Sequence, residues 1–293
     1  MKSLLAHTSK GTIEYTYLGT GPTVLVCHGT SSNCFSTDLT APLVEAGFST
    51  LLPSRPGYGR TPLEVGPSAA ETASALIALL DSLQIQTCAV LAISGGGPTG
   101  VALAATFPQR ITRLALAAAI THPEDRPNEP GYKNQAAFYG PMHNMNWSML
   151  GLMSRLSPRS MARQTLAIFS THDPDDGLSK LSEESIQIIC RFYQGRSSRK
   201  GALSDGKHTV GVDLLQSIQQ PTLVLHSRED NSVPFGHAEW SLKYIPQAEL
   251  CEAGITGHFF WVDPAYKRFY QRLIEFLSTQ APATADAPGH RHP

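Results

Sequence analysis

Short apolar runs of strand length alternate with longer segments of helical periodicity along most of the chain. The segment Ala69–Gln84 illustrates the second kind, because Leu76, Leu79, Leu80 and Leu83 fall on one helical face. This alternation is typical of α/β proteins, in which mostly parallel strands form a twisted central sheet flanked by helices. The predicted strands are Thr12–Leu18, Thr23–Cys27, Ser49–Leu52, Cys88–Ile93, Arg113–Ile120, Thr222–His226 and Glu249–Glu252.

The alternation breaks between residues 121 and 211, where polar loops flank helical stretches and no strand is expected. A chain of 293 residues can form one α/β domain that carries such an insertion. We therefore expect a core domain of residues 1–120 and 212–279, interrupted by a helical insertion at 121–211. Residues 280–293, rich in proline and alanine, are expected to form a disordered tail.

All methionines other than Met1 lie in this insertion, and Met142, Met145, Met149 and Met153 are spaced three or four residues apart. On a continuous helix they would share one face, which would be either an ordinary core face or a flexible apolar lid over a binding site. In the second case we expect substrate contacts from Met145, Trp147 and Met149.

Charge and cysteine content exclude several classes of function. With 23 lysines plus arginines and 24 acidic residues, the chain has no overall charge that would draw it to nucleic acid or an anionic membrane. Five cysteines without a C-x-x-C pair argue against a disulfide framework and a zinc cluster. No signal-peptide core is found, and no apolar run approaches the roughly 20 residues that span a bilayer. We expect a cytoplasmic protein, monomeric or homodimeric, that acts on a small molecule.

The stretch LAISGGGPTG, residues 91–100, fits two different motifs. Gly95, Gly97 and Gly100 match the G-x-G-x-x-G of dinucleotide-binding loops. Such a loop belongs at the first strand–helix turn, with an acidic residue about 20 positions later. Here several predicted strands come first, and no acidic residue follows before Glu124. No lysine follows the glycines either, so a P-loop is excluded.

The second motif is the sharp turn G-x-S-x-G, which presents a catalytic serine between a strand and a helix. Ser94 has Gly96 two positions after it and Ala92 two positions before it, where glycine is usual. Gly95 would then offer its amide to an oxyanion at a helix N-terminus, and Pro98 suits the first helical turn.

A serine hydroxyl needs a histidine as base, and the histidine needs a carboxylate to fix its tautomer. Asp230 follows one predicted strand and His258 follows a later one, which gives the order serine, aspartate, histidine that this turn requires. Three alternative acids remain: Glu229, Glu124 and Asp125.

A second oxyanion donor is expected from the loop after an early strand. The amide of Thr30, in the sequence HGT, is the candidate. His28 is also a possible base, but a role in bracing this loop by hydrogen bonds is favoured, since no acidic residue neighbours it.

Five segments in this order resemble the α/β-hydrolase superfamily, and the resemblance extends over Thr12–Ser278. They are HGT (28–30), SRPGYGRT (54–61), ISGGGP (93–98), PTLVLHSREDNSVP (221–234) and GHFFW (257–261). The resemblance implies that Ser94 is the nucleophile, Asp230 the acid and His258 the base, with the amides of Thr30 and Gly95 as oxyanion hole. It also implies that the insertion is a helical cap over the site, and a serine at the nucleophile position argues against dehalogenation and epoxide opening.

These residues predict a serine hydrolase that cleaves small to medium, apolar carboxylic esters through an acyl-enzyme, without metal or organic cofactor. Activity is expected to rise with pH as the histidine loses its proton. Carbon–carbon bond hydrolysis, lactone opening, amide hydrolysis and acyl transfer to peroxide remain alternatives, as does a ligand-binding receptor. Basic residues are expected to be structural or solvated: Arg55 and Arg60 at the sheet edge or in solvent, and Arg191, Arg196, Arg199 and Lys200 in a loop.

Overall fold

The computed structural model describes residues 2–122, 139–195 and 197–279. The expected tail at 280–293, the alternative acids Glu124 and Asp125, and Arg196 lie outside the described residues.

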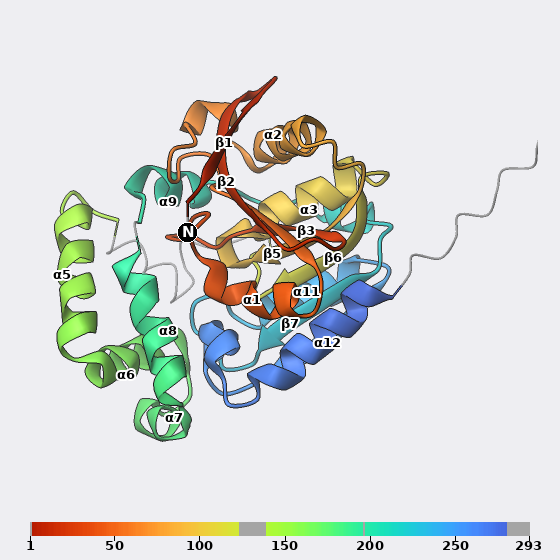
Figure 1. The fold of residues 1–293 in the computed structure, drawn as a ribbon. Helices are drawn as coiled ribbons and strands as arrows, with labels where there is room; N and C mark the ends of the chain where they lie inside the picture. The colour runs from red at the N-terminus through yellow and green to blue at the C-terminus, as the bar shows by residue number, and fades with distance from the viewer. Residues whose placement is uncertain (1, 123–138, 196, 280–293) are drawn as a thin grey trace, which may run out of the picture.

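An eight-stranded sheet forms the centre of the molecule, in the order β1-β2-β4-β3-β5-β6-β7-β8 (Figure 1). The pairs β1–β2 and β2–β4 are antiparallel, and all pairs from β4 to β8 are parallel. The strands are β1 Leu4–Thr8, β2 Gly11–Leu18, β3 Thr23–Cys27, β4 Ser49–Pro53, β5 Cys88–Ile93, β6 Ile111–Ala117, β7 Thr222–Ser227 and β8 Ala248–Ala253. The predicted α/β fold class is confirmed, and β1 is a strand that the sequence pattern did not predict.

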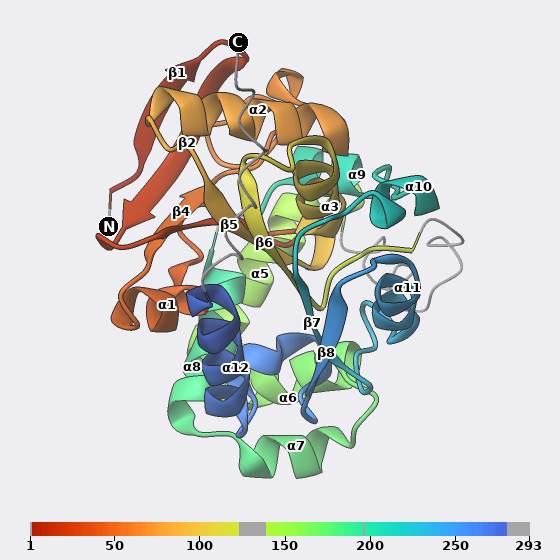
Figure 2. The ribbon, with the colours of Figure 1, turned by 90° about the vertical axis from the view of Figure 1, so that its right-hand side faces the viewer.

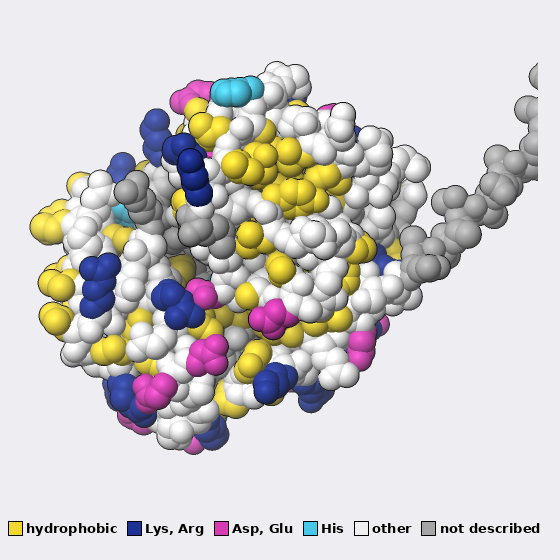
Figure 3. All heavy atoms as spheres, in the orientation of Figure 1, with side chains coloured by type: hydrophobic (Ala, Val, Ile, Leu, Met, Phe, Trp, Pro, Cys, Tyr) yellow, Lys and Arg dark blue, Asp and Glu magenta, His cyan; other side chains and the backbone are white. Residues whose placement is uncertain are grey.

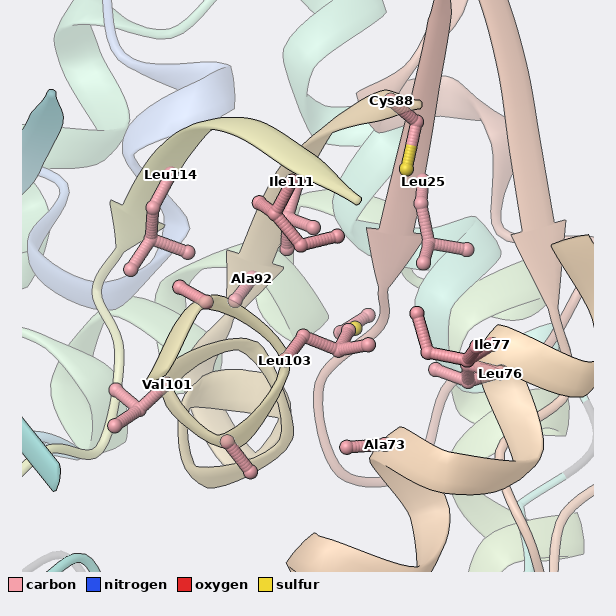
Figure 4. Close-up of a cluster of buried hydrophobic side chains, with 14 of the residues drawn as sticks. Leu25, Ala73, Leu76, Ile77, Cys88, Ala92, Val101, Leu103, Ile111 and Leu114 are labelled. Carbon is pink, nitrogen blue, oxygen red and sulfur yellow. The ribbon is translucent and has the colours of Figure 1, made fainter. Parts of the chain in front are cut away.

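Helices cover both faces of the sheet, so the middle strands β5 and β7 are buried along their whole length. One face packs α2, α3, α10 and α11 (Figure 2) against strand side chains such as Leu25, Ala92 and Leu114, which are labelled in Figure 4. The other face packs α1 and α12 against the strand side chains that point the opposite way, such as Val24 of β3 and Leu91 of β5. These helices are α1 Ala41–Glu45, α2 Ala69–Ser82, α3 Gly97–Thr106, α10 Val212–Gln216, α11 Gly236–Tyr244 and α12 Tyr266–Ser278.

Between β6 and β7 the described chain forms the helices α5 to α9 ahead of α10, and α5 to α8 pack against one another. Their shared apolar cluster includes Ile186, Ile189 and Tyr193, and it also takes in Phe259 and Val262 from the loop after β8. This cluster joins the helical group to the loop after β8, and Figure 1 shows the group beside the sheet. The helices are α5 His143–Leu156, α6 Pro158–Phe169, α7 Pro174–Lys180, α8 Glu183–Gln194 and α9 Arg199–Asp205.

The methionine face of α5 points to solvent, so neither a core face nor a pocket lining describes it. Met145 is 61% exposed and Met149 is 56% exposed, and Figure 3 shows hydrophobic side chains along the edge of the molecule where α5 lies in Figure 1. The same helix turns Trp147 and Leu150 inward onto α8 and its neighbours. Periodicity predicted a shared face correctly but not the side on which the helix meets the protein.

Within the described ranges, no helix is both long enough and apolar enough to cross a membrane.

Candidate active site

Ser94 lies at a sharp turn between β5 and α3, inside a short 3₁₀ segment, Ser94–Gly96. Its φ of 49° is in the left-handed region, which costs a non-glycine residue energy and is typical of strained functional turns. A Cβ atom on Gly96 would overlap the carbonyl oxygen of Cys27, and one on Gly97 would overlap that of Ile120. The glycines after Ser94 therefore allow the turn to approach the ends of β3 and β6, and this explains the third glycine of the triplet.

The predicted acid and base meet at this serine. Nε2 of His258 lies 3.0 Å from Oγ of Ser94, and Nδ1 of His258 lies 2.8 Å from Oδ2 of Asp230. Oδ1 of Asp230 accepts the amides of Ser232 and Val233, both at 2.8 Å, and the Asp230 side chain is fully buried. An ionised carboxylate only accepts hydrogen bonds, so Nδ1 carries the imidazole proton and Nε2 is left to accept from the serine hydroxyl.

The alternative acid Glu229 faces another way. Its carboxylate accepts a hydrogen bond from the Thr171 hydroxyl, and its backbone amide donates to Ser227. The structure thus joins Asp230 rather than Glu229 to His258.

The oxyanion loop, which we define as His28–Asn33, passes directly beside Ser94. A Cβ atom on Gly29 would lie 3.1 Å from Cβ of Ser94, and one on Gly95 would lie 3.3 Å from the amide nitrogen of Thr30. The two predicted oxyanion donors, Thr30 and Gly95, are therefore neighbours at the serine.

His28 braces this loop and does not contact the serine. Its Nε2 accepts the amide of Arg55 at 3.0 Å, and its Nδ1 donates to the carbonyl of Gly29 at 2.8 Å. Burial, together with the charge of Arg55, lowers the pKa of His28 to about 3, so the ring is neutral. The favoured interpretation of His28 agrees with this geometry.

Arg55 was expected at the sheet edge or in solvent, and the second alternative is wrong, because Arg55 is buried, with 1% exposure. Its guanidinium binds both oxygens of Asp205, at 2.6 and 2.7 Å, and its Nε donates to the carbonyl of His28 at 2.8 Å. Only this last contact lies at the sheet edge. No local pattern indicates a role for Asp205, which belongs to a segment whose composition is typical of a polar loop.

Two other arginines also form ion pairs near the site. Arg60 binds the buried carboxylate of Glu14 at 2.7 Å. Burial opposes ionisation of Glu14, but hydrogen bonds from Arg60, Ser3 and Ser54 outweigh it and lower the Glu14 pKa. Arg191 is on the helix α8, not in a loop, and it pairs with Asp38 at 2.9 Å.

A cavity of about 900 Å³ opens over Ser94 and His258. Its wall has an aromatic part, in which the ring of Phe169 stacks on His258 at a centroid distance of 5.9 Å. Trp147 lines the cavity as expected, whereas the exposed Met145 and Met149 are not among its lining residues. The aromatic part comprises Trp147, Phe169, Phe192, Tyr193, Phe259 and Trp261, and hydroxyl and amide groups come from Ser31, Ser32, Asn33, Ser36, Gln194, Ser197 and Ser198.

Comparison with known proteins agrees with this architecture. A family model described as alpha/beta hydrolase fold matches residues 22–265. The chain is 35% identical over 272 residues to the uncharacterized hydrolase YcgS of Bacillus subtilis (strain 168), which covers 92% of this chain and 96% of that protein. It is 26% identical over 240 residues to a 2-hydroxy-6-oxononadienedioate/2-hydroxy-6-oxononatrienedioate hydrolase of Cupriavidus pinatubonensis, covering 80% and 78% of the two chains.

Among solved structures, an alpha/beta hydrolase fold protein from Nakamurella multipartita superposes with a TM-score of 0.75 at 25% identity, over 94% of this chain and 99% of that one. The family match and the relative from Bacillus subtilis lead to one conclusion: the chain is a hydrolase that belongs to the α/β hydrolase fold family.

Proposed function

We propose that the protein is a serine hydrolase that cleaves carboxylic esters through an acyl-enzyme. The observation that carries the proposal is the continuous series of hydrogen bonds from Asp230 through His258 to Ser94. Thr30 and Gly95, which lie against each other, are beside this serine. A serine at the base of a large cavity has little structural use for such a chain, whereas acyl transfer needs each of its members.

The geometry supports the following sequence of steps. Oγ of Ser94 attacks the ester carbonyl while Nε2 of His258 takes its proton, and the resulting oxyanion accepts the amides of Thr30 and Gly95. His258 then returns the proton to the leaving alcohol, which leaves the acyl group on Ser94. Water repeats the cycle with His258 as base and releases the acid. Asp230 keeps Nδ1 protonated and stabilises the imidazolium that forms twice.

The cavity wall supports apolar substrates of small to medium size. The six side chains of the aromatic part, together with Phe35 and Tyr139, line the cavity that contains Ser94 and His258, and they favour an aryl or alkyl group. The charged pair of Arg191 and Asp38 also lines the cavity, but each partner already meets the other's charge at 2.9 Å. A charged substrate would have to compete with that pair.

A p-nitrophenyl ester series tests the proposal. We expect wild-type turnover to depend on acyl length and the Ser94→Ala variant to lose at least about 10³-fold in kcat. Ser74→Ala, at a half-buried serine of α2, is the matched control and should keep wild-type activity. Undiminished turnover by Ser94→Ala would contradict the mechanism.

Carbon–carbon bond hydrolysis is the second candidate, because the relative from Cupriavidus pinatubonensis is named as a hydrolase of a 2-hydroxy-6-oxo dienedioate. The same serine, histidine and oxyanion donors serve both reactions. Product analysis with a panel of esters, lactones, amides, a peroxide acceptor and a 2-hydroxy-6-oxo dienoate would separate the candidates. Turnover of the dienoate at a higher kcat/KM than any ester would make it the activity. Tight binding without turnover of any compound would indicate a receptor.

A further inference from the structure

The carboxylate of Asp205 lies beneath the oxyanion loop and receives hydrogen bonds from three directions. Arg55 binds both of its oxygens, and the hydroxyls of Tyr58 and Thr30 donate to Oδ2 at 2.7 and 2.8 Å. Asp205 and Tyr58 are buried, like Arg55, with 3% and 0% of their surfaces exposed. A carboxylate with this many buried donors holds each donor in a narrow range of positions.

Thr30 is the donor that connects this carboxylate to the reaction centre. A Cβ atom on Gly95 would overlap the Thr30 hydroxyl and would lie 3.1 Å from Oδ2 of Asp205. The hydroxyl, the carboxylate and the Thr30 amide thus crowd together against Gly95. Because the hydroxyl is bound to Asp205, the position of the whole Thr30 residue, including its amide, depends on that hydrogen bond.

A negative charge this close to a developing oxyanion would oppose the reaction unless it were neutralised. Arg55 supplies the opposite charge in a bidentate pair and is itself tied to the end of β3 through the carbonyl of His28. Burial opposes ionisation of Asp205, but Arg55 and the hydroxyl of Tyr58 outweigh it and keep the Asp205 pKa below its ordinary value. The pair is therefore ionised on both sides and neutral overall.

Asp205 belongs to α9, in the inserted region, whereas Thr30 belongs to the core. Close packing holds α9 in place: a Cβ atom on Gly201 would overlap the ring of Tyr58, and Ser204 donates to the carbonyl of Pro67 at 3.0 Å. The helix α9 thus packs on the core and, through Asp205, binds the oxyanion loop.

We propose that Asp205 is a positioning residue of the oxyanion hole, which acts by holding the hydroxyl of Thr30 so that the Thr30 amide stays beside Gly95. The inference rests on the proposed serine hydrolase function. It assigns to α9 a part in catalysis that requires no contact with the substrate.

Thr30→Val tests this link, because it removes the hydroxyl and keeps the amide and the shape. We expect kcat for a p-nitrophenyl ester to fall about 10- to 100-fold with little change in KM, since one oxyanion donor is worth about 10²–10³ in kcat. Thr30→Ser keeps a hydroxyl and should stay within about threefold of wild type. Thr72→Val removes another buried threonine hydroxyl, which lies on α2 and donates to the carbonyl of Gly66, and should leave kcat unchanged.

The role of Asp205 itself is tested by Asp205→Asn and by the double variant with Thr30→Val. If Asp205 acts through Thr30, the double variant loses about as much kcat as Asp205→Asn alone; multiplied losses would overturn the inference. If Asp205→Asn does not fold, Tyr58→Phe replaces it in the same cycle, because it removes another hydrogen bond to the same oxygen.

A reversible trifluoromethyl ketone separates failure of this inference from failure of the proposed function. Ser94 adds to such a ketone and forms a tetrahedral oxyanion, so the inhibition constant of the ketone reports how well the oxyanion hole binds that oxyanion. It is measured in wild type and variants from the degree to which the ketone slows labelling of Ser94 by a fluorescent phosphonate probe. We expect that constant to rise in Thr30→Val by the same factor as kcat/KM falls. An unchanged constant would overturn the inference while ester turnover upholds the function. If no ester or dienoate is turned over, the function fails and the ketone series still decides the role of Thr30.

Discussion

Oδ2 of Asp230 lies 2.8 Å from Nδ1 of His258, while Oδ1 of the same carboxylate is held by two backbone amides. The carboxylate is thereby fixed at one oxygen and directs the imidazole with the other. Because both oxygens of Asp230 have separate partners, Glu229 in the same loop cannot replace it.

Asp230→Asn should reduce kcat about 10³- to 10⁴-fold, because an amide can donate to Nδ1 and so favour the tautomer that cannot accept the serine proton. Steady-state hydrolysis of the best nitrophenyl ester measures the loss. Glu229→Gln, one residue away and directed at Thr171, should stay within about threefold of wild type. The opposite ranking of the two variants would transfer the acid role to Glu229.

Buried His28 makes the stability of the fold depend on pH. Its pKa is lowered from an ordinary 6.5 to about 3, so the unfolded chain binds a proton in this interval that the folded chain does not. Stability from this group therefore falls as pH falls below 6.5, and we expect a loss of about 1–2 kcal/mol between pH 6.5 and pH 5. Urea unfolding across this range, above the titration of most carboxylates, measures the slope.

Two glutamine variants show whether His28 is the source of this pH dependence: His28→Gln is the test and His7→Gln is the control. His28→Gln should be less stable at pH 7 and show a smaller slope, although the buried His226, whose pKa burial also lowers, keeps part of it. His7→Gln, at an exposed histidine, should leave the slope at the wild-type value. Equal slopes in all three proteins would mean that His28 is not the source.

Gly97→Ala should destabilise the fold by about 1–3 kcal/mol, because the new methyl group would overlap the backbone of Ile120 in the segment that follows β6. Gly236→Ala is the matched control: it also replaces the first residue of a helix, and a Cβ atom there meets nothing within 4 Å. We expect it to be neutral or slightly stabilising. Thermal unfolding of both variants gives the comparison, and equal shifts would contradict the close approach at Gly97.

Local patterns predicted the parts of the structure that are locally determined. Seven of the strands follow from short apolar runs, and Ser94, Asp230 and His258 follow from turn chemistry at strand ends, where a parallel sheet brings distant loops together. The edge strand β1 escaped detection because it is mostly exposed and mixes apolar with polar residues. The pairing of Arg55 with Asp205 joins residues 150 positions apart, and nothing local to either residue indicates the other.

Trp147 lines the cavity, whereas Met145 and Met149 do not. Substitution of Trp147 should therefore change the dependence of kcat/KM on acyl length, and substitution of a methionine should not. Trp147 contacts the ring of Phe192 at a centroid distance of 5.5 Å and donates to the carbonyl of Gly195, so it fixes one wall of the cavity. Trp147→Leu should lower kcat/KM for the longest acyl esters about tenfold relative to acetate, because lost apolar contact weakens discrimination by acyl length. Met149→Gln, on the exposed side of the same helix, should leave the length profile unchanged. An altered profile in Met149→Gln with an unaltered one in Trp147→Leu would place the methionine face, not the aromatic wall, against the substrate.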